Sequence, residues 1–322
     1  MQKKDLRTRV TTGTYTLPAM TALTAVLWVA PDAGSWRLWA GLVAAAWTAF
    51  QLIELNNRCT LLRVRSRMVS VTFLGLLLVL PAAHGFTPQS LVPLCVAASF
   101  RPLFGAYQKA EAQHHVFQAF LLVSLGSLLF PPLLLLLPCY CLSLAVHLRA
   151  LTGRTLAAGV LGAALPYWLG ATWAMWRGDL GARAAEWAAA FRFAPPGDGG
   201  LGEALAALGP ARQAAGAFML ALALMATVHF LRTAYNDKIR TRMFFYTFIV
   251  SEVAVAAGLV VRPQDFDTLA PVLAVCAAPL AGHYFTLARG RGMNVWFVLW
   301  CLLCAALCAF TYACTWMPSL IS

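Results

Sequence analysis

The chain has 322 residues, of which 61% are hydrophobic and 11% are charged, and its formal net charge is +12. A soluble domain normally carries about 25% charged residues, so this composition cannot cover a water-facing surface and excludes soluble, disordered and collagen-like proteins. The sequence therefore predicts an all-α, polytopic transmembrane helical bundle, with the bilayer and not nucleic acid as the partner that explains its basic residues.

A helix needs about 20 mostly apolar residues to cross a membrane. The sequence predicts about eleven such spans, and their ranges are 14–30, 37–55, 67–83, 88–106, 115–131, 133–148, 155–176, 210–231, 242–261, 267–287 and 293–315. Pro131-Pro132 separates the fifth span from the sixth without a polar loop, so this stretch is either a tight hairpin or one broken helix. We favour the hairpin, because proline suits the first turn of a helix and disrupts its interior.

The long connection at 177–209 is the only sizeable segment outside these spans. Leu180, Ala184, Trp187 and Phe191 recur there at helical spacing with charged residues between them. This pattern predicts a helix near 179–193 that lies in the outer membrane interface, either as a cover over the bundle or as a docking helix for a partner.

The basic residues predict the orientation. With a cytoplasmic N-terminus, 17 of the 24 Lys and Arg residues face the cytoplasm. Arg101 falls within the fourth span, and the six that face outside are Arg37, Arg177, Arg183, Arg192, Arg212 and Arg262. Cytoplasmic loops are normally the basic ones, so we expect the N-terminus inside and the C-terminus outside.

One segment of the chain is duplicated. Arg63-Val-Arg-Ser-Arg-Met68, followed by Thr72-Phe73, recurs 175 residues later as Lys238-Ile-Arg-Thr-Arg-Met243, followed by Thr247-Phe248. Pro88-Gln89 matches Pro263-Gln264, and Pro102-Leu103 matches Pro279-Leu280. The match predicts two related halves, with spans 1–6 in residues 1–150 and spans 7–11 in residues 151–322. The two basic loops are six spans apart and lie on the same side, so the repeat is parallel.

These duplicated basic loops contain the first candidate site residues, which are Arg63, Arg65, Arg67, Lys238, Arg240 and Arg242. Guanidinium groups at this spacing can hold a phosphate, either on an anionic lipid head group or on a phosphorylated substrate. The alternative is that the loops only orient the chain and attract anionic lipids without specificity.

Two further candidates are charged residues inside predicted spans, Arg101 and Glu252. A charge at that depth costs several kcal/mol unless it is paired or hydrated. In the repeat, Glu252 corresponds to Leu77 and Arg101 to Ala278, so each charge interrupts one half only. We expect the two to approach each other or to share a polar cavity between the halves, as part of a substrate path or as a buried pair that fixes helix register.

The histidines and cysteines predict no metal site and no cofactor. Five of the six His residues fall near cytoplasmic ends of spans, at the level of Glu54, Glu111 and Asp237, but none has the spacing of a metal-binding motif. Cys301, Cys304 and Cys308 share one face of the last span and are interpreted as small packing residues. The chain also lacks phosphate-binding, dinucleotide-binding and nucleophile motifs.

Three segments resemble a family of uncharacterised bacterial multi-pass inner-membrane proteins, some of which are labelled carotene oxygenases. They are Asn57-Arg58 with Arg65-Ser66-Arg67, then Asn236-Asp-Lys-Ile-Arg-Thr-Arg242, then Ala278-Pro-Leu-Ala-Gly-His283. The resemblance implies a bacterial inner-membrane location and a similar span count, and it carries over no site residue. An oxygenase would need several His residues that converge on iron, whereas those of this chain are scattered.

Three functions follow from these features. The first is a protein that binds or translocates an anionic or lipid-like substrate between its two halves, with Arg101 and Glu252 along the path. The second is a membrane-embedded enzyme that acts on a lipid-linked phosphate. The third is a non-catalytic scaffold with other envelope proteins as partners. A transporter needs a polar cavity, an enzyme needs convergent acid, base or metal groups, and a scaffold needs neither.

Overall fold

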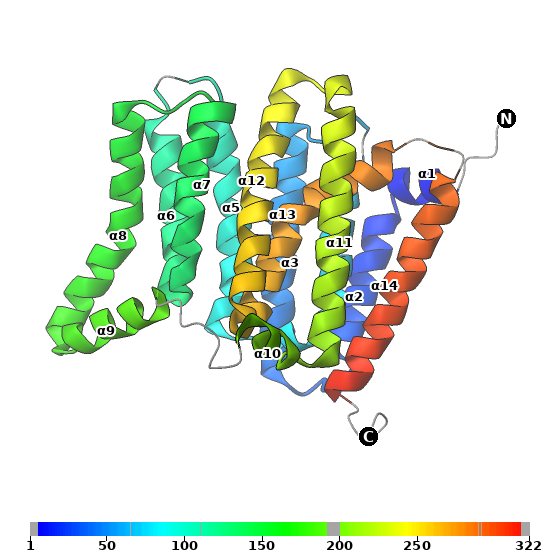
Figure 1. Cartoon of the computed structure of the whole chain (residues 1–322), viewed down its shortest axis with the longest axis horizontal. Coiled ribbons are helices and arrows are strands. Elements are labelled where there is room, and N and C mark those ends of the chain that lie inside the picture. Colours follow the sequence, from blue (N-terminus) through cyan, green and yellow to red (C-terminus); the bar gives the residue numbers. More distant parts are fainter. Residues whose placement is uncertain are drawn as a thin grey trace.

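The computed structural model describes residues 6–64, 66–109, 111–191, 200–288, 290 and 292–316. This part of the chain is 85% helical and contains 14 α-helices and no strand. Most of the long helices run side by side, and α9 and α10 lie at one end of the bundle (Figure 1). The chain is therefore an all-α protein, as its composition predicts.

The first part of the chain forms α1 to α8, with short 3₁₀ segments and one π-helix between them. The elements are α1 (Leu6–Thr12), α2 (Thr16–Val29), α3 (Trp36–Cys59), α4 (Met68–Leu78), η1 (Pro81–Ala83), η2 (Pro88–Leu91), α5 (Val92–Gly105), α6 (Gln113–Leu129), η3 (Pro131–Leu135), α7 (Leu136–Leu142), the π-helix η4 (Ser143–His147) and α8 (Gly153–Arg177).

The remainder forms α9 to α14. The elements are α9 (Leu180–Phe191), α10 (Gly200–Ala206), α11 (Gly209–Thr233), η5 (Ala234–Asn236), α12 (Ile239–Val261), η6 (Pro263–Asp265), α13 (Phe266–Leu287) and α14 (Met293–Trp316). Helix α9 covers most of the predicted interfacial helix, and residues 192 and 193 of that prediction lie outside the described residues.

Six helical stretches are long and apolar enough to cross a membrane: α3, α8, α11 with η5, α12, η6 with α13, and α14. Three shorter apolar stretches accompany them, namely α2, α4 and Pro131–His147. Large apolar side chains lie on the outside of the bundle, and Trp168, Leu224 and Leu302 are each more than 60% exposed. A surface of this kind suits lipid, so the chain is a multi-pass membrane protein.

Helix α13 is the centre of the bundle. From Phe266 to Phe285 its side chains are buried, with the exception of Asp267. Its neighbours include α4, α5, α11 and α12. A Cβ at Gly282 would lie 3.0 Å from the backbone nitrogen of Val69. The absence of a side chain at Gly282 thus lets α13 and α4 approach closely, which is a common way for membrane helices to pack.

The stretch around Pro131 contains two helical segments that form a hairpin. Helix α6 ends at Leu129, Phe130 has a non-helical backbone with φ −145° and ψ 86°, and Pro131 begins the next segment. The second segment returns toward the start of the first, since the backbone N–H of Gln108 donates to the carbonyl of Leu148 at 2.8 Å. Proline thus begins a helix here, where its missing N–H costs nothing.

The segments that match in the predicted repeat fall in elements of the same kind. The first basic segment precedes α4, whereas Arg240 and Arg242 of the second lie in the first turn of α12. A 3₁₀ turn that begins with proline follows each helix, at Pro88 after the intervening η1, or at Pro263. The next helix then carries an internal proline, at Pro102 in α5 and at Pro279 in α13. Helices α4 and α12 separate the basic segments from these proline turns. We call the end of the bundle with the basic segments the Arg-loop end, and the opposite end, with the proline turns, the pocket end.

Candidate functional site

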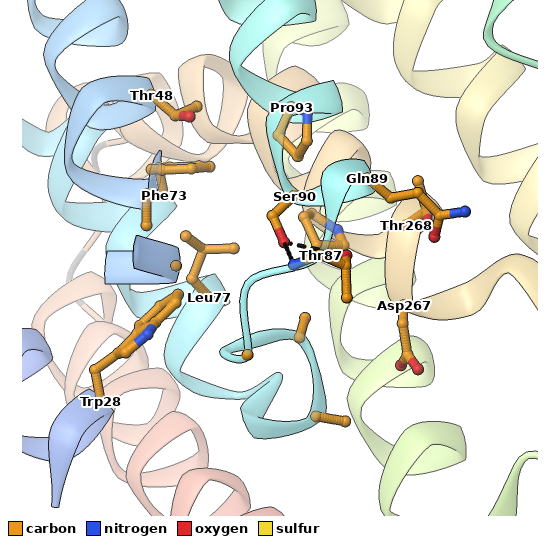
Figure 2. A pocket seen from close by; sticks show the side chains of 16 residues that line it. Trp28, Thr48, Phe73, Leu77, Thr87, Gln89, Ser90, Pro93, Asp267 and Thr268 are labelled. Carbon is orange, nitrogen blue, oxygen red and sulfur yellow. Dashed lines mark hydrogen bonds between the residues drawn. The ribbon is translucent and has the colours of Figure 1, made fainter. Parts of the chain in front are cut away.

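A pocket of about 200 Å³ opens at the pocket end, between helices of the first half and the beginning of α13 (Figure 2). It is lined by Trp28, Gly41, Ala45, Thr48, Phe73, Leu77, Ala82, Ala83, Gly85, Thr87, Gln89, Ser90, Pro93, Asp267, Thr268 and Pro271. The floor is buried and mostly apolar, with Trp28, Phe73 and Leu77, and the mouth is polar, with Thr87, Gln89 and Asp267 exposed. The lining is therefore amphipathic.

The polar mouth is held in place by hydrogen bonds within and between the two halves. The backbone N–H of Thr87 donates to Ser90 Oγ at 3.1 Å, which closes the first turn of η2. Thr268 Oγ1 on α13 donates to Gln89 Oε1 at 3.0 Å and so connects the two halves across the pocket. Asp267 accepts two hydrogen bonds from Arg212, at 3.0 and 2.8 Å, so its negative charge is compensated.

His84 lies behind the pocket and joins four segments. Its ring stacks on Trp28, with ring centroids 3.7 Å apart, and its Nε2 lies 3.2 Å from the carbonyl oxygen of Leu77. Its backbone carbonyl accepts from Trp28 Nε1 at 3.2 Å, and Tyr312 Oη lies 3.2 Å from its Nδ1. Burial lowers the pKa of His84 to about 4, against a smaller opposing effect of the hydrogen bond with Leu77. The imidazole is therefore neutral at neutral pH.

The Arg-loop end contains a buried ionic cluster that the sequence did not single out. Asp237, whose side chain is fully buried, lies 2.6 Å from Arg63 Nε and 3.0 Å from His283 Nε2. Burial raises the pKa of Asp237, but the hydrogen bonds and charges of His283 and Arg63 outweigh it and hold that pKa below its ordinary value. We call Arg63, Asp237 and His283 the Asp237 cluster.

The Asp237 cluster brings the two duplicated loops together, because Arg63 belongs to the first loop and Asp237 immediately precedes the second. At the position that corresponds to Asp237, the first half has Leu62. That difference between the two matched segments is a sequence signal that could have pointed to Asp237. A carboxylate beside the second basic segment thus pairs with an arginine of the first.

The remaining basic candidates are distributed around this cluster. Arg67, Lys238 and Arg240 are exposed, and the guanidinium of Arg240 lies 5.3 Å from the centre of the Phe244 ring. Arg242 is half-buried, and its Nε is buried without a hydrogen-bond partner among the described residues. Arg65 lies outside the described residues.

Arg101 and Glu252 do not form the expected pair. Glu252 is buried in α12 and accepts a hydrogen bond from Thr227 Oγ1 at 2.7 Å. Arg101 is exposed and has no ion pair within the described ranges. Helix α5 ends at Gly105, about 6 Å along the helix from Arg101. The long side chain of Arg101 can therefore reach the Arg-loop end of the bundle and needs no buried partner. Neither residue lines the pocket.

Polar side chains of α13 connect the two ends of the bundle. Thr268 lies at the pocket, Cys276 follows two turns later, and His283 belongs to the Asp237 cluster. Their spacing of eight and seven residues places all three on one side of the helix, over about 22 Å. The pocket itself ends at Thr268 and Pro271, and beyond it the side chains of α13 are tightly packed.

A metal ion has no evident binding place in the part of the chain that the structure describes, because no three His, Cys, Asp or Glu side chains there are grouped to hold one. Comparison with known proteins adds no further constraint: no family model, curated protein or solved structure matches this chain.

Proposed function

We propose that this chain is a bacterial inner-membrane protein that binds a lipid-like substrate between two related halves and moves it across the bundle. The pocket is the observation that carries the proposal. Both halves contribute to it, its floor is apolar and its mouth is polar, which is the arrangement that an amphipathic molecule requires.

The chemistry of the pocket restricts the substrate class. Its polar groups are hydroxyls, an amide and the carboxylate of Asp267, and the described lining residues include no lysine or arginine. A polar neutral or zwitterionic head group fits such a lining better than a free anion. An anionic head group is better matched at the Arg-loop end, where Arg67, Lys238 and Arg240 are exposed.

Movement across the bundle requires the two ends to open alternately. The pocket end is open, while the Asp237 cluster and the packed side chains of α13 close the Arg-loop end. Since Arg63 belongs to one half and both Asp237 and His283 to the other, separating the halves at this end would break that ion pair. This is the behaviour expected of a gate between two rigid units.

The membrane topology is part of the same proposal. We infer eleven spans, a parallel repeat and a cytoplasmic N-terminus, with α9 in the outer interface. The eleven predicted ranges overlap α2 to α8 and α11 to α14, with η3, α7 and η4 as one span. The corresponding elements of the two halves, described above, support the repeat. Trp187 of α9 packs against Tyr167 of α8, with ring centroids 5.1 Å apart, as a covering helix would.

The enzyme alternative has weaker support in the pocket. Acid–base chemistry on a lipid-linked phosphate would need titratable groups that converge on the substrate. Of the described side chains that line the pocket, Asp267 is the one ordinary acid or base, and Arg212 already engages both of its oxygens.

The test is to fill the pocket. Ala45 lines it, and Ala45→Phe places a ring in the floor. Ala46 is exposed on the outside of the same helix, so Ala46→Phe is the matched control. We expect the wild type and Ala46→Phe, purified in mild detergent, to retain the same lipid, identified by mass spectrometry after extraction. Ala45→Phe should retain about tenfold less, which corresponds to a loss of ~1.4 kcal/mol in binding free energy.

Translocation needs a second measurement. Proteoliposomes that contain nitrobenzoxadiazole-labelled phosphatidylethanolamine are treated with dithionite, which reduces only the dye in the outer leaflet. Wild-type protein should make more than half of the dye accessible to dithionite, because it moves labelled lipid from the inner to the outer leaflet. Ala45→Phe should slow this lipid movement. Equal lipid retention by the wild type and Ala45→Phe would refute the binding site, and protein-independent accessibility would refute the movement.

A further inference from the structure

Glu252 is the buried acidic residue that the pocket and the Asp237 cluster leave unexplained. It lies near the middle of α12, and 4% of its surface is exposed. Its Oε1 accepts the hydrogen bond from Thr227 Oγ1 at 2.7 Å, whereas its Oε2 is buried without a partner among the described residues. One oxygen of this carboxyl group is thus unsatisfied in the interior of the membrane.

The surroundings of Glu252 contain neutral groups from each packed helix. Helix α11 contributes the hydroxyl of Thr227, and α13 contributes the thiol of Cys276, which lies within electrostatic reach of the carboxyl group. On α7, Cys139 lies within electrostatic reach of Cys276, and the hydroxyl of Tyr140 is hydrogen-bonded to Ser99 at 2.7 Å.

The basic groups of the neighbouring helices are engaged elsewhere. His283 of α13 contacts Asp237, and the rings of His229 on α11 and His147 on η4 pack against Tyr284 and Tyr246. In the described part of the chain, no Lys, Arg or His forms an ion pair or hydrogen bond with Glu252. An ionised carboxylate at this depth would therefore lack a counter-charge, and such a charge costs several kcal/mol.

Packing does not require an acid at this position. The residue that corresponds to Glu252 in the other half is Leu77, which is buried in α4. A leucine thus fills the equivalent place, and it needs no hydrogen bond. An acid that is costly, uncompensated and dispensable for packing is better explained by a function than by a structural role.

We propose that Glu252 is a proton-binding site, protonated while the bundle is closed around it and able to release the proton when the halves separate and water enters. A carboxylic acid removes the uncompensated charge, and hydration or a bound cation stabilises the carboxylate. Proton release would then accompany the movement of the substrate. That coupling rests on the proposed function, whereas proton binding by Glu252 does not.

The test uses dicyclohexylcarbodiimide, an apolar reagent that enters membranes and reacts with protonated carboxyl groups. The acid adds across one C=N bond: its oxygen bonds to the central carbon, its proton moves to nitrogen, and the adduct rearranges to an N-acylurea without loss of atoms. Purified wild-type protein is treated at several pH values, and the modified peptides are identified by mass spectrometry. We expect modification at Glu252, with a rate that falls about tenfold per pH unit once the acid is mostly ionised.

Two controls separate a buried acid from a reactive surface carboxylate. Glu54 is partly exposed near the end of α3, whereas Glu252 is buried, so a water-soluble carbodiimide at mildly acidic pH should reach Glu54 and not Glu252. Glu252→Gln keeps the size of the side chain and an acceptor for Thr227, and it should lose the modification. Absence of the adduct at Glu252, or a rate that does not change with pH, would overturn the proton site.

The coupling between proton release by Glu252 and lipid movement is tested in proteoliposomes that contain the labelled phospholipid described above. A pH-sensitive dye inside the vesicles reports the internal pH. An imposed pH gradient should change the rate of lipid movement in the wild type and have no effect in Glu252→Gln. An equal response of both proteins would overturn the coupling. Carbodiimide modification of Glu252 in a protein that fails the pocket-filling test would refute the proposed function and leave the proton site intact.

Discussion

Replacing His84 by glutamine should remove an acid-sensitive contribution to the stability of the protein. His84 is fully buried, and burial lowers its pKa from the ordinary value of 6.5 to about 4. The unfolded chain binds this proton near pH 6.5, and the folded chain binds it only near pH 4. The stabilising contribution of the neutral His84 ring to the free energy of unfolding is therefore fully present above pH 6.5 and is lost as the pH falls toward 4.

The magnitude follows from that difference in pKa. At about 1.4 kcal/mol per pH unit, the shift from 6.5 to about 4 corresponds to about 3.5 kcal/mol. About 2 kcal/mol of it is lost by pH 5, since the unfolded chain then binds nearly one more proton than the folded chain. This is a sizeable part of the 5–15 kcal/mol by which a typical domain is stable.

The hydrogen bonds of His84 make the prediction a sharp one. Nε2–H can donate to the carbonyl of Leu77, which leaves Nδ1 of the neutral ring to accept from Tyr312. The hydroxyl of Tyr312 also donates to the carbonyl of Leu27, at 2.9 Å, and it has one proton for both. A charged imidazolium would resolve this competition, because its Nδ1–H could donate to Tyr312 Oη. Burial and hydrogen bonding thus oppose each other, and the prediction holds that burial is stronger.

The assay is thermal unfolding in detergent between pH 7.5 and 4.5, for the wild type, His84→Gln and Tyr312→Phe. We expect the Tm of the wild type to fall as the pH decreases from 6.5, and the Tm of His84→Gln to fall less. Tyr312→Phe removes the acceptor for Nδ1–H and should make the acid loss steeper. A wild-type Tm that rises on acidification, or equal slopes for the wild type and His84→Gln, would refute the reasoning.

Three further predictions concern contacts in the interior of the bundle. Arg63→Ala leaves Asp237 buried with His283 as its remaining partner and should lower the free energy of unfolding by about 1–3 kcal/mol, whereas Arg67→Ala, at an exposed position, should leave the Tm unchanged. Gly282→Ala directs a methyl group at the backbone of Val69 and should lower the free energy of unfolding, measured by chemical denaturation, by about 1–3 kcal/mol. In the same measurement Gly153→Ala, whose methyl group meets no atom within 4 Å, should have no effect. Tyr140→Phe removes the buried hydrogen bond to Ser99 and should cost about 1 kcal/mol in chemical denaturation, and an unchanged midpoint would show that this bond contributes nothing.

The composition and the apolar periodicity determined the class of this protein and the places of its helices. Apolar runs of about 20 residues can satisfy their backbone in lipid only as helices, so the elements follow from local sequence alone. The hairpin at Pro131-Pro132 was also predictable, because the steric demands of proline are local.

What the sequence could not decide was which side chains meet. Arg101 and Glu252 stand out in the sequence because both are charged residues inside predicted spans. In the structure, however, Arg101 lies near the Arg-loop end, where α5 ends, and Glu252 contacts Thr227. Conversely, the contact of Arg63 with Asp237 joins residues 174 positions apart and depends on how the halves dock. Such contacts arise from the packing around α13, which no local pattern encodes.

The pocket belongs to the same class of features. Its floor comes from α2, α3 and α4, its mouth from the turn around η2 and from the start of α13, and in the sequence these residues are ordinary threonines, prolines and alanines. The sequence by itself determined that the chain is a helical membrane protein, because the hydrophobic effect and backbone hydrogen bonding act on each segment separately. Only the tertiary structure decided where the polar groups converge, because that depends on the packing of segments that are distant along the chain.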